Sequence, residues 1–92
     1  MSHAFPRLAV TPPAFCRSKI LRTELTRFFP HSTFNTKDRY LSEDELIDFL
    51  QEAQGALIGR DPVTERVLRA HPQLRVISKY GVGLDNIDPE AL

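Results

Sequence analysis

The chain has 92 residues, with 12 Lys and Arg against 12 Asp and Glu, so its formal net charge is zero. A balanced charge argues against a nucleic-acid or anionic-membrane partner, because both kinds of partner need clustered basic residues. Hydrophobic residues make up 41% of the chain, which is enough for one small folded domain. The single cysteine, Cys16, excludes an intrachain disulfide and a cysteine-based zinc site.

Apolar stretches are short throughout the sequence. None is long enough to span a bilayer, and the first residues lack the apolar core of a signal peptide. We therefore expect a cytoplasmic protein.

The first part of the chain predicts a strand, a helix and a second strand. Residues 8–11 are an apolar run before two prolines, which is typical of a buried strand. Ser18 can cap a helix that Pro30 ends, and residues 32–35 form a weaker second strand. The expected apolar face of this helix carries Leu21, Leu25 and Phe28.

The clearest helix signal follows. Ser42 and Glu45 have the spacing of a capping box, in which each side chain bonds the backbone N–H of the other residue. Gly55 stands where such a helix commonly stops. The apolar stripe of this second helix is expected to contain Leu46, Ile47, Leu50 and Ala53.

The rest of the chain repeats the pattern. Residues 56–58 are a short buried-strand candidate, and Asp61 followed by Pro62 is typical of a helix start. This third helix would end near His71, and residues 74–79 would form a fourth strand. Its apolar side is expected to carry Val63, Val67 and Leu68. Asp88-Pro89 repeats the Asp61-Pro62 pattern, so the chain is expected to stop where another helix begins.

Strands that alternate with helices imply right-handed crossovers and a parallel sheet with helices on both faces. We therefore predict an α/β fold, a flavodoxin-like three-layer α/β/α unit whose four-stranded parallel sheet has the order 2-1-3-4. In such sheets, ligands bind outside the carboxyl ends of the strands. Three predicted loops lie on this edge, at residues 12–17, 59–61 and 80–85.

The glycines after the fourth strand form a candidate anion site. Gly81-Val82-Gly83 leaves this strand, and glycine lets successive backbone N–H groups converge on a carboxylate or a phosphate. The alternative is that these glycines only make a tight turn. The pattern is not a dinucleotide fingerprint, because Asn86 stands where the third glycine would be.

Three further residues could support this anion site. Lys79, Tyr80 and Arg60 are close enough in the predicted sheet to add positive charge or a hydroxyl group.

The run DPVTERVLRAHPQLRVISKYGVGLDNIDPEAL, residues 61–92, resembles the N-terminal substrate-binding domain of the D-isomer-specific 2-hydroxyacid dehydrogenases. The resemblance is strong over residues 56–92 and only architectural over residues 8–55. It implies that residues 1–92 are a partial substrate-binding domain. The whole protein would be an NAD(P)-dependent oxidoreductase acting on the CH–OH group of a small D-2-hydroxy acid.

The resemblance also implies roles for single residues. In the family, the loop that matches residues 80–83 offers backbone N–H groups to the substrate carboxylate, which implies this role for Val82 and Gly83. Arg60 matches an arginine near the substrate phosphate of phosphoglycerate-type members, although the loop after it is shorter here. Lys79 stands where many members have arginine. The run that contains Asp85, Asn86 and Asp88 matches turn and cap residues.

The family's glycine-rich nucleotide fingerprint and its catalytic arginine, glutamate and histidine match no residue of this chain. We therefore expect no catalytic, cofactor-binding or metal residues here, and no nicotinamide-linked turnover by the chain alone. NAD or NADP would serve the full-length enzyme. His3, His31 and His71 are interpreted as structural, the latter two as surface residues at helix ends, and Cys16 as a semi-buried inert thiol.

The sequence predicts two kinds of partner and leaves one alternative function open. The partners are a small carboxylate substrate and a second copy of the chain, because Val76 and Ile77 would lie on an unpaired edge strand. The alternative is a free-standing, non-catalytic ligand-binding or interaction module. A reading frame that continues past Leu92 into a glycine-rich fingerprint would favour the enzyme, and a natural stop would favour the module.

Overall fold

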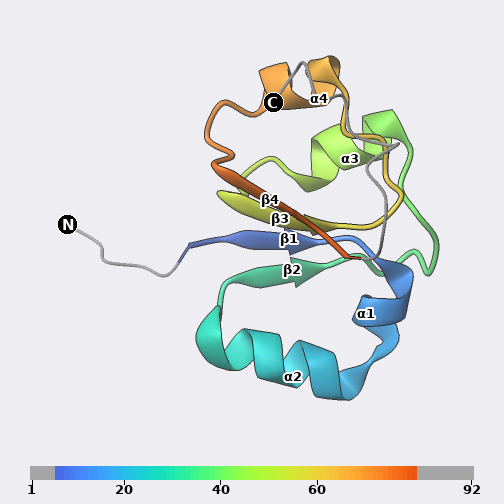
Figure 1. Cartoon of the computed structure of the whole chain (residues 1–92), viewed down its shortest axis with the longest axis vertical. Coiled ribbons are helices and arrows are strands. Elements are labelled where there is room, and N and C mark those ends of the chain that lie inside the picture. The colour runs from blue at the N-terminus through green and yellow to red at the C-terminus, as the bar shows by residue number, and fades with distance from the viewer. Residues whose placement is uncertain (1–5, 81–92) are drawn as a thin grey trace.

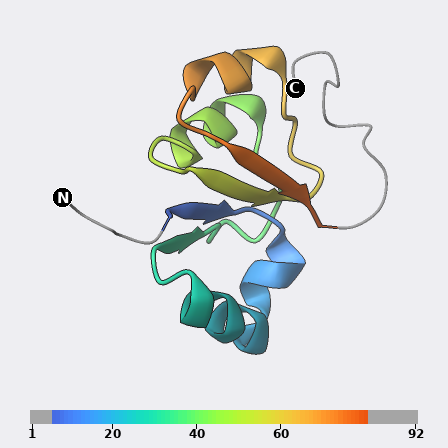
Figure 2. The ribbon, with the colours of Figure 1, turned by 60° about the vertical axis from the view of Figure 1, so that its left-hand side comes forward.

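A computed structural model describes residues 6–80 of the chain. Within this range the strands are β1 (Leu8–Val10), β2 (Ser32–Phe34), β3 (Gly55–Ile58) and β4 (Val76–Lys79). The helices are α1 (Pro13–Arg17), α2 (Lys19–Phe28), α3 (Glu43–Phe49) and α4 (Glu65–Ala70). Helices α3 and α4 cover one face of the sheet, and α1 and α2 lie on the other (Figure 1). The same three layers are visible after rotation (Figure 2).

The sheet has the order β2-β1-β3-β4, and its three neighbouring pairs are all parallel. Val10 pairs with Phe34 on one side and Leu57 on the other, and Ile58 pairs with Lys79. The predicted three-layer fold and strand order are therefore confirmed. Parallel strands joined through helices leave all their carboxyl ends at one edge of the sheet.

Two apolar clusters fill the space between the layers. The alternation of side chains along a strand turns Ala56 and Ile58 toward α3 and α4, and Leu57 toward α1 and α2. The buried members on the α3–α4 side are Ala9, Leu41, Leu46, Leu50, Ala53, Ala56, Ile58, Val63 and Val67. On the other side, the cluster is built on Val10, Phe15 and Cys16. The larger cluster therefore lies between the sheet and α3–α4.

The two predicted caps at Ser18 and Ser42 are confirmed. Ser18 Oγ accepts the N–H of Leu21 at 3.2 Å and begins α2. At α3, the Glu45 N–H donates to Ser42 Oγ at 3.3 Å, and the Ser42 N–H donates to Glu45 Oε1 at 2.9 Å. Both bonds of the capping box are thus present, and they satisfy backbone donors that the helix leaves unpaired.

The predicted start of the last helix at Asp61-Pro62 is wrong. Helix α4 begins at Glu65, and its cap is Thr64, whose Oγ1 accepts the Val67 N–H at 3.3 Å. Asp61 cannot cap this helix because its buried carboxylate accepts hydrogen bonds from three other loop residues.

Two expectations about helix limits are also corrected. Residues 12–17 are not a loop, because Pro13–Arg17 forms α1, in which the fixed φ of Pro13 suits the first turn. Gly55 does not end α3, which stops at Phe49 with Leu50 as its C-cap. Gly55 begins β3 instead, and its N–H donates to Arg7 O at 3.3 Å.

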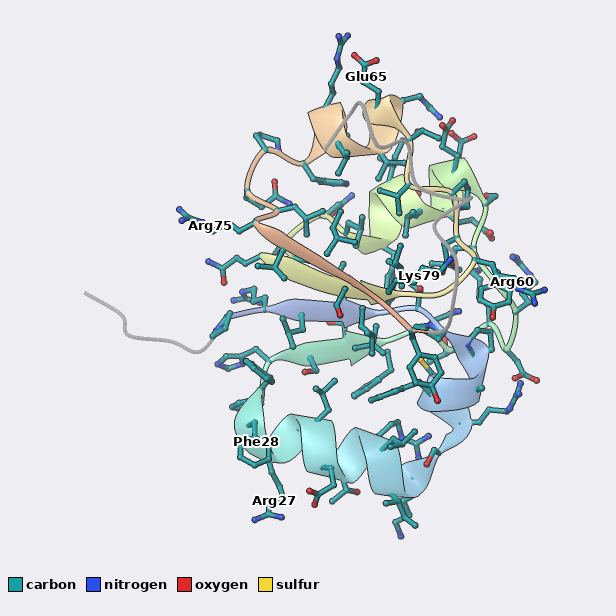
Figure 3. The ribbon with its side chains drawn as sticks, viewed as in Figure 1. Arg27, Phe28, Arg60, Glu65, Arg75 and Lys79 are labelled. Atoms are coloured by element: carbon teal, nitrogen blue, oxygen red, sulfur yellow. The ribbon has the colours of Figure 1, made fainter. Side chains whose placement is uncertain are left out.

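Phe28 and Val76 are two of the exposed large apolar residues. The Phe28 side chain does not face the core with Leu25, since it is 64% exposed and points away from the sheet (Figure 3). The Arg27 guanidinium lies 5.8 Å from the centre of its ring. In β4, Ile77 packs on the α3–α4 cluster, whereas Val76 is 62% exposed on the opposite face.

Candidate functional site

The carboxyl edge of the sheet carries two cationic residues, Arg60 and Lys79. Ile58 pairs with Lys79, and the Tyr80 N–H donates to Ile58 O at 2.7 Å. Arg60 follows Ile58 by two residues and therefore emerges beside the end of β4. Figure 3 shows Arg60 and Lys79 on the same side of the molecule, while Arg75 lies at the opposite end of β4.

Arg60 differs from two other arginines of this edge in its electrostatic surroundings. Arg17 forms an ion pair with Asp38 at 2.5 Å, and Arg39 forms one with Glu45 at 2.7 Å. The exposed Arg60 side chain takes part in none of the ion pairs found within residues 6–80. Its exposed guanidinium can therefore meet an external anion.

The Tyr80 ring is directed toward α1. It packs edge-on against Phe15, with 5.6 Å between the ring centres and 89° between the ring planes. Lys79 precedes it in the chain and shares the face of Ile77, because side chains alternate along a strand. The structure thus places Arg60, Lys79 and Tyr80 at one edge, with the Tyr80 ring on the α1 side. The predicted residues Gly81, Val82 and Gly83 lie outside the described residues.

A buried carboxylate joins three loops of the same edge. Asp61 Oδ1 accepts the Thr11 hydroxyl, which follows β1, and the Gly59 N–H at 3.2 Å, which follows β3. Asp61 Oδ2 accepts the Leu41 N–H at 2.7 Å, from the segment before α3. Asp61 is fully buried. Hydrogen-bond donors from three segments therefore surround a group that would be costly to bury alone.

Asn35 extends this network to the end of β2. Its Nδ2 donates to Thr11 O at 3.0 Å and to Arg39 O at 2.7 Å, and its Oδ1 accepts the Lys37 N–H at 2.9 Å. The segments after β1, β2 and β3 are thus joined through Thr11, Asn35 and Asp61.

This network was not predicted from the sequence, although one signal for it is present. Thr11 and Asn35 are polar and directly follow β1 and β2, and residues at such positions meet at the carboxyl edge of a parallel sheet. Asp61 was interpreted as a helix cap because its local pattern, followed by Pro62, fits a cap equally well.

The other singled-out residues of the described range have structural environments. Cys16 is buried, its Sγ lies 3.3 Å from Val10 O, and burial raises the pKa of its thiol. His31 is exposed. His71 is buried rather than on the surface, and its Nε2 lies 2.5 Å from Ile47 O. Because a carbonyl only accepts hydrogen bonds, Nε2 carries the proton.

The glycines and ionisable side chains of the same range bear on cofactor and metal binding. Its two glycines do not fit a dinucleotide cradle, because Gly59 lies against the Tyr40 ring and Gly55 against the Leu8 side chain. Residues 6–80 contain no group of three His, Cys, Asp or Glu side chains that could hold a metal ion. The longest helix there, α2, has ten residues, and none of the described helices could cross a membrane.

Comparisons with solved structures define the class of fold. A D-isomer specific 2-hydroxyacid dehydrogenase, NAD-binding, from a Polaromonas species superposes with a TM-score of 0.80 at 23% identity, over 95% of this chain and 27% of that chain. The NAD⁺-bound 3-phosphoglycerate dehydrogenase of Entamoeba histolytica gives a TM-score of 0.79 at 22% identity, over 96% and 30%. At these identities, the likeness shows a shared fold.

Sequence comparisons then give the family. Residues 15–92 match the catalytic domain of the D-isomer specific 2-hydroxyacid dehydrogenases. The chain therefore belongs to this family.

Two curated relatives are similar in sequence. The D-3-phosphoglycerate dehydrogenase of Synechocystis is 42% identical over 52 residues, which is 55% of this chain and 9% of the relative. The glyoxylate/hydroxypyruvate reductase B of Yersinia pestis is 34% identical over 83 residues, which is 87% of this chain and 26% of the relative. The matched part of the chain thus spans about a quarter or less of these relatives.

Proposed function

We propose that the chain is the substrate-binding part of an NAD(P)-dependent oxidoreductase that acts on the CH–OH group of a small D-2-hydroxy acid. The family supports the reaction class, since the relatives include dehydrogenases and reductases of small acids. The structural observation that carries the proposal is the pairing of Ile58 with Lys79, because it brings Arg60 and Lys79 to one edge.

The chemistry of this edge suits a carboxylate. A guanidinium offers N–H donors in a planar fork, and an ammonium group adds a compact positive charge. In the proposal, Arg60 and Lys79 attract the substrate anion, and the backbone N–H groups of Val82 and Gly83 hold its carboxylate. Gly81 has no side chain, so it lets the loop come close to the carboxylate. The Tyr80 hydroxyl is a further donor. The proposal assigns no cofactor contact to this chain.

Ligand binding can be measured on the 92-residue chain by titrating the ¹⁵N-labelled protein with D-glycerate and following amide chemical shifts. Glycerol is the matched neutral ligand, since it has similar hydroxyls and no carboxylate. We expect saturable shifts around residues 59–61 and 78–83 with D-glycerate alone, weakened by added salt. Equal shifts with glycerol, or no saturation, would contradict carboxylate binding.

Two charge-removing variants locate the site. Lys79→Gln and Arg75→Gln each remove one positive charge, the first at the carboxyl end of β4 and the second just before its first residue (Figure 3). We expect Lys79→Gln to weaken D-glycerate binding about fivefold, and Arg75→Gln to leave it nearly unchanged. Equal losses would mean that net charge, rather than the carboxyl edge, attracts the ligand.

The reaction itself is tested on the protein encoded by the complete reading frame that contains these residues. We expect this protein to oxidise NADH or NADPH in the presence of hydroxypyruvate or glyoxylate. Carboxylate binding without any nicotinamide-linked turnover would contradict the oxidoreductase and favour a binding module.

A further inference from the structure

We propose that Asp61 is a positioning residue, whose buried carboxylate fixes the backbone of the loop that carries Arg60 so that Arg60 can meet a carboxylate ligand. This inference rests on the proposed function and assigns to that site a residue that does not touch the ligand.

The first support is the burial and bonding of the carboxylate. Asp61 is completely buried at the edge where Arg60 emerges, and Thr11, Leu41 and Gly59 all donate to it. Thr11 and Leu41 are 50 and 20 residues away in the sequence. A buried carboxylate that collects distant donors holds these segments at fixed positions relative to one another, because each lost bond would leave a buried polar group unsatisfied.

The second support is the position of Arg60 between two held residues. Gly59, before it, donates its N–H to Asp61 Oδ1 and lies against the Tyr40 ring. Asp61, after it, is held through its own side chain. The backbone of Arg60 is therefore fixed on both sides, while its side chain remains exposed. A fixed backbone with an exposed guanidinium lowers the entropy that is lost when the ligand binds.

The sign of the charge effect makes the inference testable. Asp61 is negative and adjoins Arg60, so its removal makes the edge more positive. Electrostatic attraction alone then predicts tighter binding of D-glycerate by Asp61→Asn. A positioning role predicts weaker binding, because the loop loses part of what holds it. The two explanations therefore give opposite results for the same variant.

Thr11 provides a test without any change of charge. Thr11→Val keeps the shape of the side chain and removes the hydroxyl that donates to Asp61, whereas Thr11→Ser keeps the hydroxyl. We expect Asp61→Asn and Thr11→Val to weaken D-glycerate binding several-fold, and Thr11→Ser to bind like the unmodified chain. Asp48→Asn is the matched control, since it makes the same substitution at an exposed carboxylate of α3.

Amide hydrogen exchange reports the loop directly. In the unmodified chain, the Gly59 and Leu41 amides donate to Asp61. We expect both to exchange faster in Thr11→Val and Asp61→Asn, while amides in the centre of α3 keep their rates. Global destabilisation would instead speed up both groups. If Asp61→Asn does not fold, the comparison of Thr11→Val with Thr11→Ser still tests the positioning role.

The outcomes separate the two proposals. If the unmodified chain does not bind D-glycerate, the proposed function fails, and so does a ligand-positioning role for Asp61. If it binds, and Thr11→Val binds equally well or Asp61→Asn binds more tightly, the positioning role fails and the proposed function stands. Weaker binding by both variants, with rescue in Thr11→Ser, supports the inference.

Discussion

Gly59 shows how one atom can matter at the candidate edge. A Cβ atom at this position would lie 2.5 Å from Cε1 of the Tyr40 ring, closer than real Cβ atoms approach a neighbour. At Gly55, the nearest atom would be Cδ2 of Leu8 at 2.9 Å, which is the end of a flexible side chain. The two glycines therefore offer a matched pair of substitutions.

We predict that Gly59→Ala lowers the free energy of unfolding by about 1–3 kcal/mol, the usual cost of overpacking. Gly55→Ala should cost less, because Leu8 can change its rotamer. Urea denaturation measures both. In a Tyr40→Ala background, the cost of Gly59→Ala should largely disappear. An unchanged cost in that background would show that the ring is not the obstacle.

His71 and Asp61 show where residue-level prediction ends. Both are polar, and both are buried because a partner from another segment satisfies them, Ile47 O for the imidazole and Leu41 N–H for the carboxylate. These partners are 24 and 20 residues away. A local pattern around His71 or Asp61 contains no information about such a partner, so the surface and cap interpretations were wrong.

Helices α3 and α4 are joined through the cap residue of α4. Thr64 Oγ1 accepts the Val67 N–H at 3.3 Å and donates to Glu43 Oε2 at 2.5 Å. Arg66 adds bonds to Glu43 and to Asp44, each at 2.7 Å. One hydroxyl thus serves both the start of a helix and the contact between two helices.

We predict that Thr64→Ala destabilises the chain by about 1–2 kcal/mol, because it removes a helix cap and the bond to α3. Thr64→Ser should retain most of the stability. Thr26→Ala is the control, since the Thr26 hydroxyl bonds a carbonyl of its own helix on the surface, and such changes usually stay within about 0.5 kcal/mol. Equal thermal shifts for Thr64→Ala and Thr26→Ala would refute the cap.

The capping box of α3 gives a prediction about acid stability. Bonds from the Arg39 guanidinium, and next the Ser42 N–H, lower the pKa of Glu45. The unfolded chain has an ordinary value of about 4.3. The stabilising effect of ionised Glu45 is therefore complete above that value and is lost as the pH falls toward the lower folded pKa.

We expect Glu45→Gln to be less stable than the unmodified chain at pH 7, and the difference to shrink below about pH 4. Thermal melts between pH 7 and pH 3 measure it. If the melting temperatures of the two chains differ by the same amount at every pH in this range, Glu45 has the same pKa in the folded and unfolded chains.

At the level of elements, prediction succeeded where the cause is local. The bonds between Ser42 and Glu45 span three residues, so the local sequence contains both partners. The parallel sheet follows from the alternation of strands and helices. Helix α1 was not predicted and the start of α4 was wrong, since Pro13 and Asp61 each fit more than one local structure. The prediction that Phe28 faces the core was wrong for another reason. Phe28 shares the apolar period of α2, but its ring contacts Arg27 and solvent instead of the sheet.

At the level of the whole molecule, the two faces of the sheet are covered unequally. On the α1–α2 side, a groove of about 450 Å³ lies between α2 and the strands β3 and β4. Its apolar lining residues include Leu8, Leu25, Phe29, Leu57 and Val76. None of the ten residues of α2 is fully buried. An apolar groove beside an edge strand is typical of an association surface.

We predict that the 92-residue chain self-associates through this groove and the β4 edge, most simply as a two-fold dimer. Burial of one valine contributes about 1.5 kcal/mol. In a two-fold dimer, each of the two subunits buries its own Val76. Val76→Lys should therefore weaken association on the order of a hundredfold.

Sedimentation across a concentration series measures the association. Ile20→Lys is the matched control, because Ile20 is 76% exposed on α2 but does not line the groove. If Val76→Lys and Ile20→Lys weaken association equally, added charge, rather than loss of this surface, opposes association. A chain that stays monomeric at millimolar concentration would show that the groove and the β4 edge do not bind a second copy.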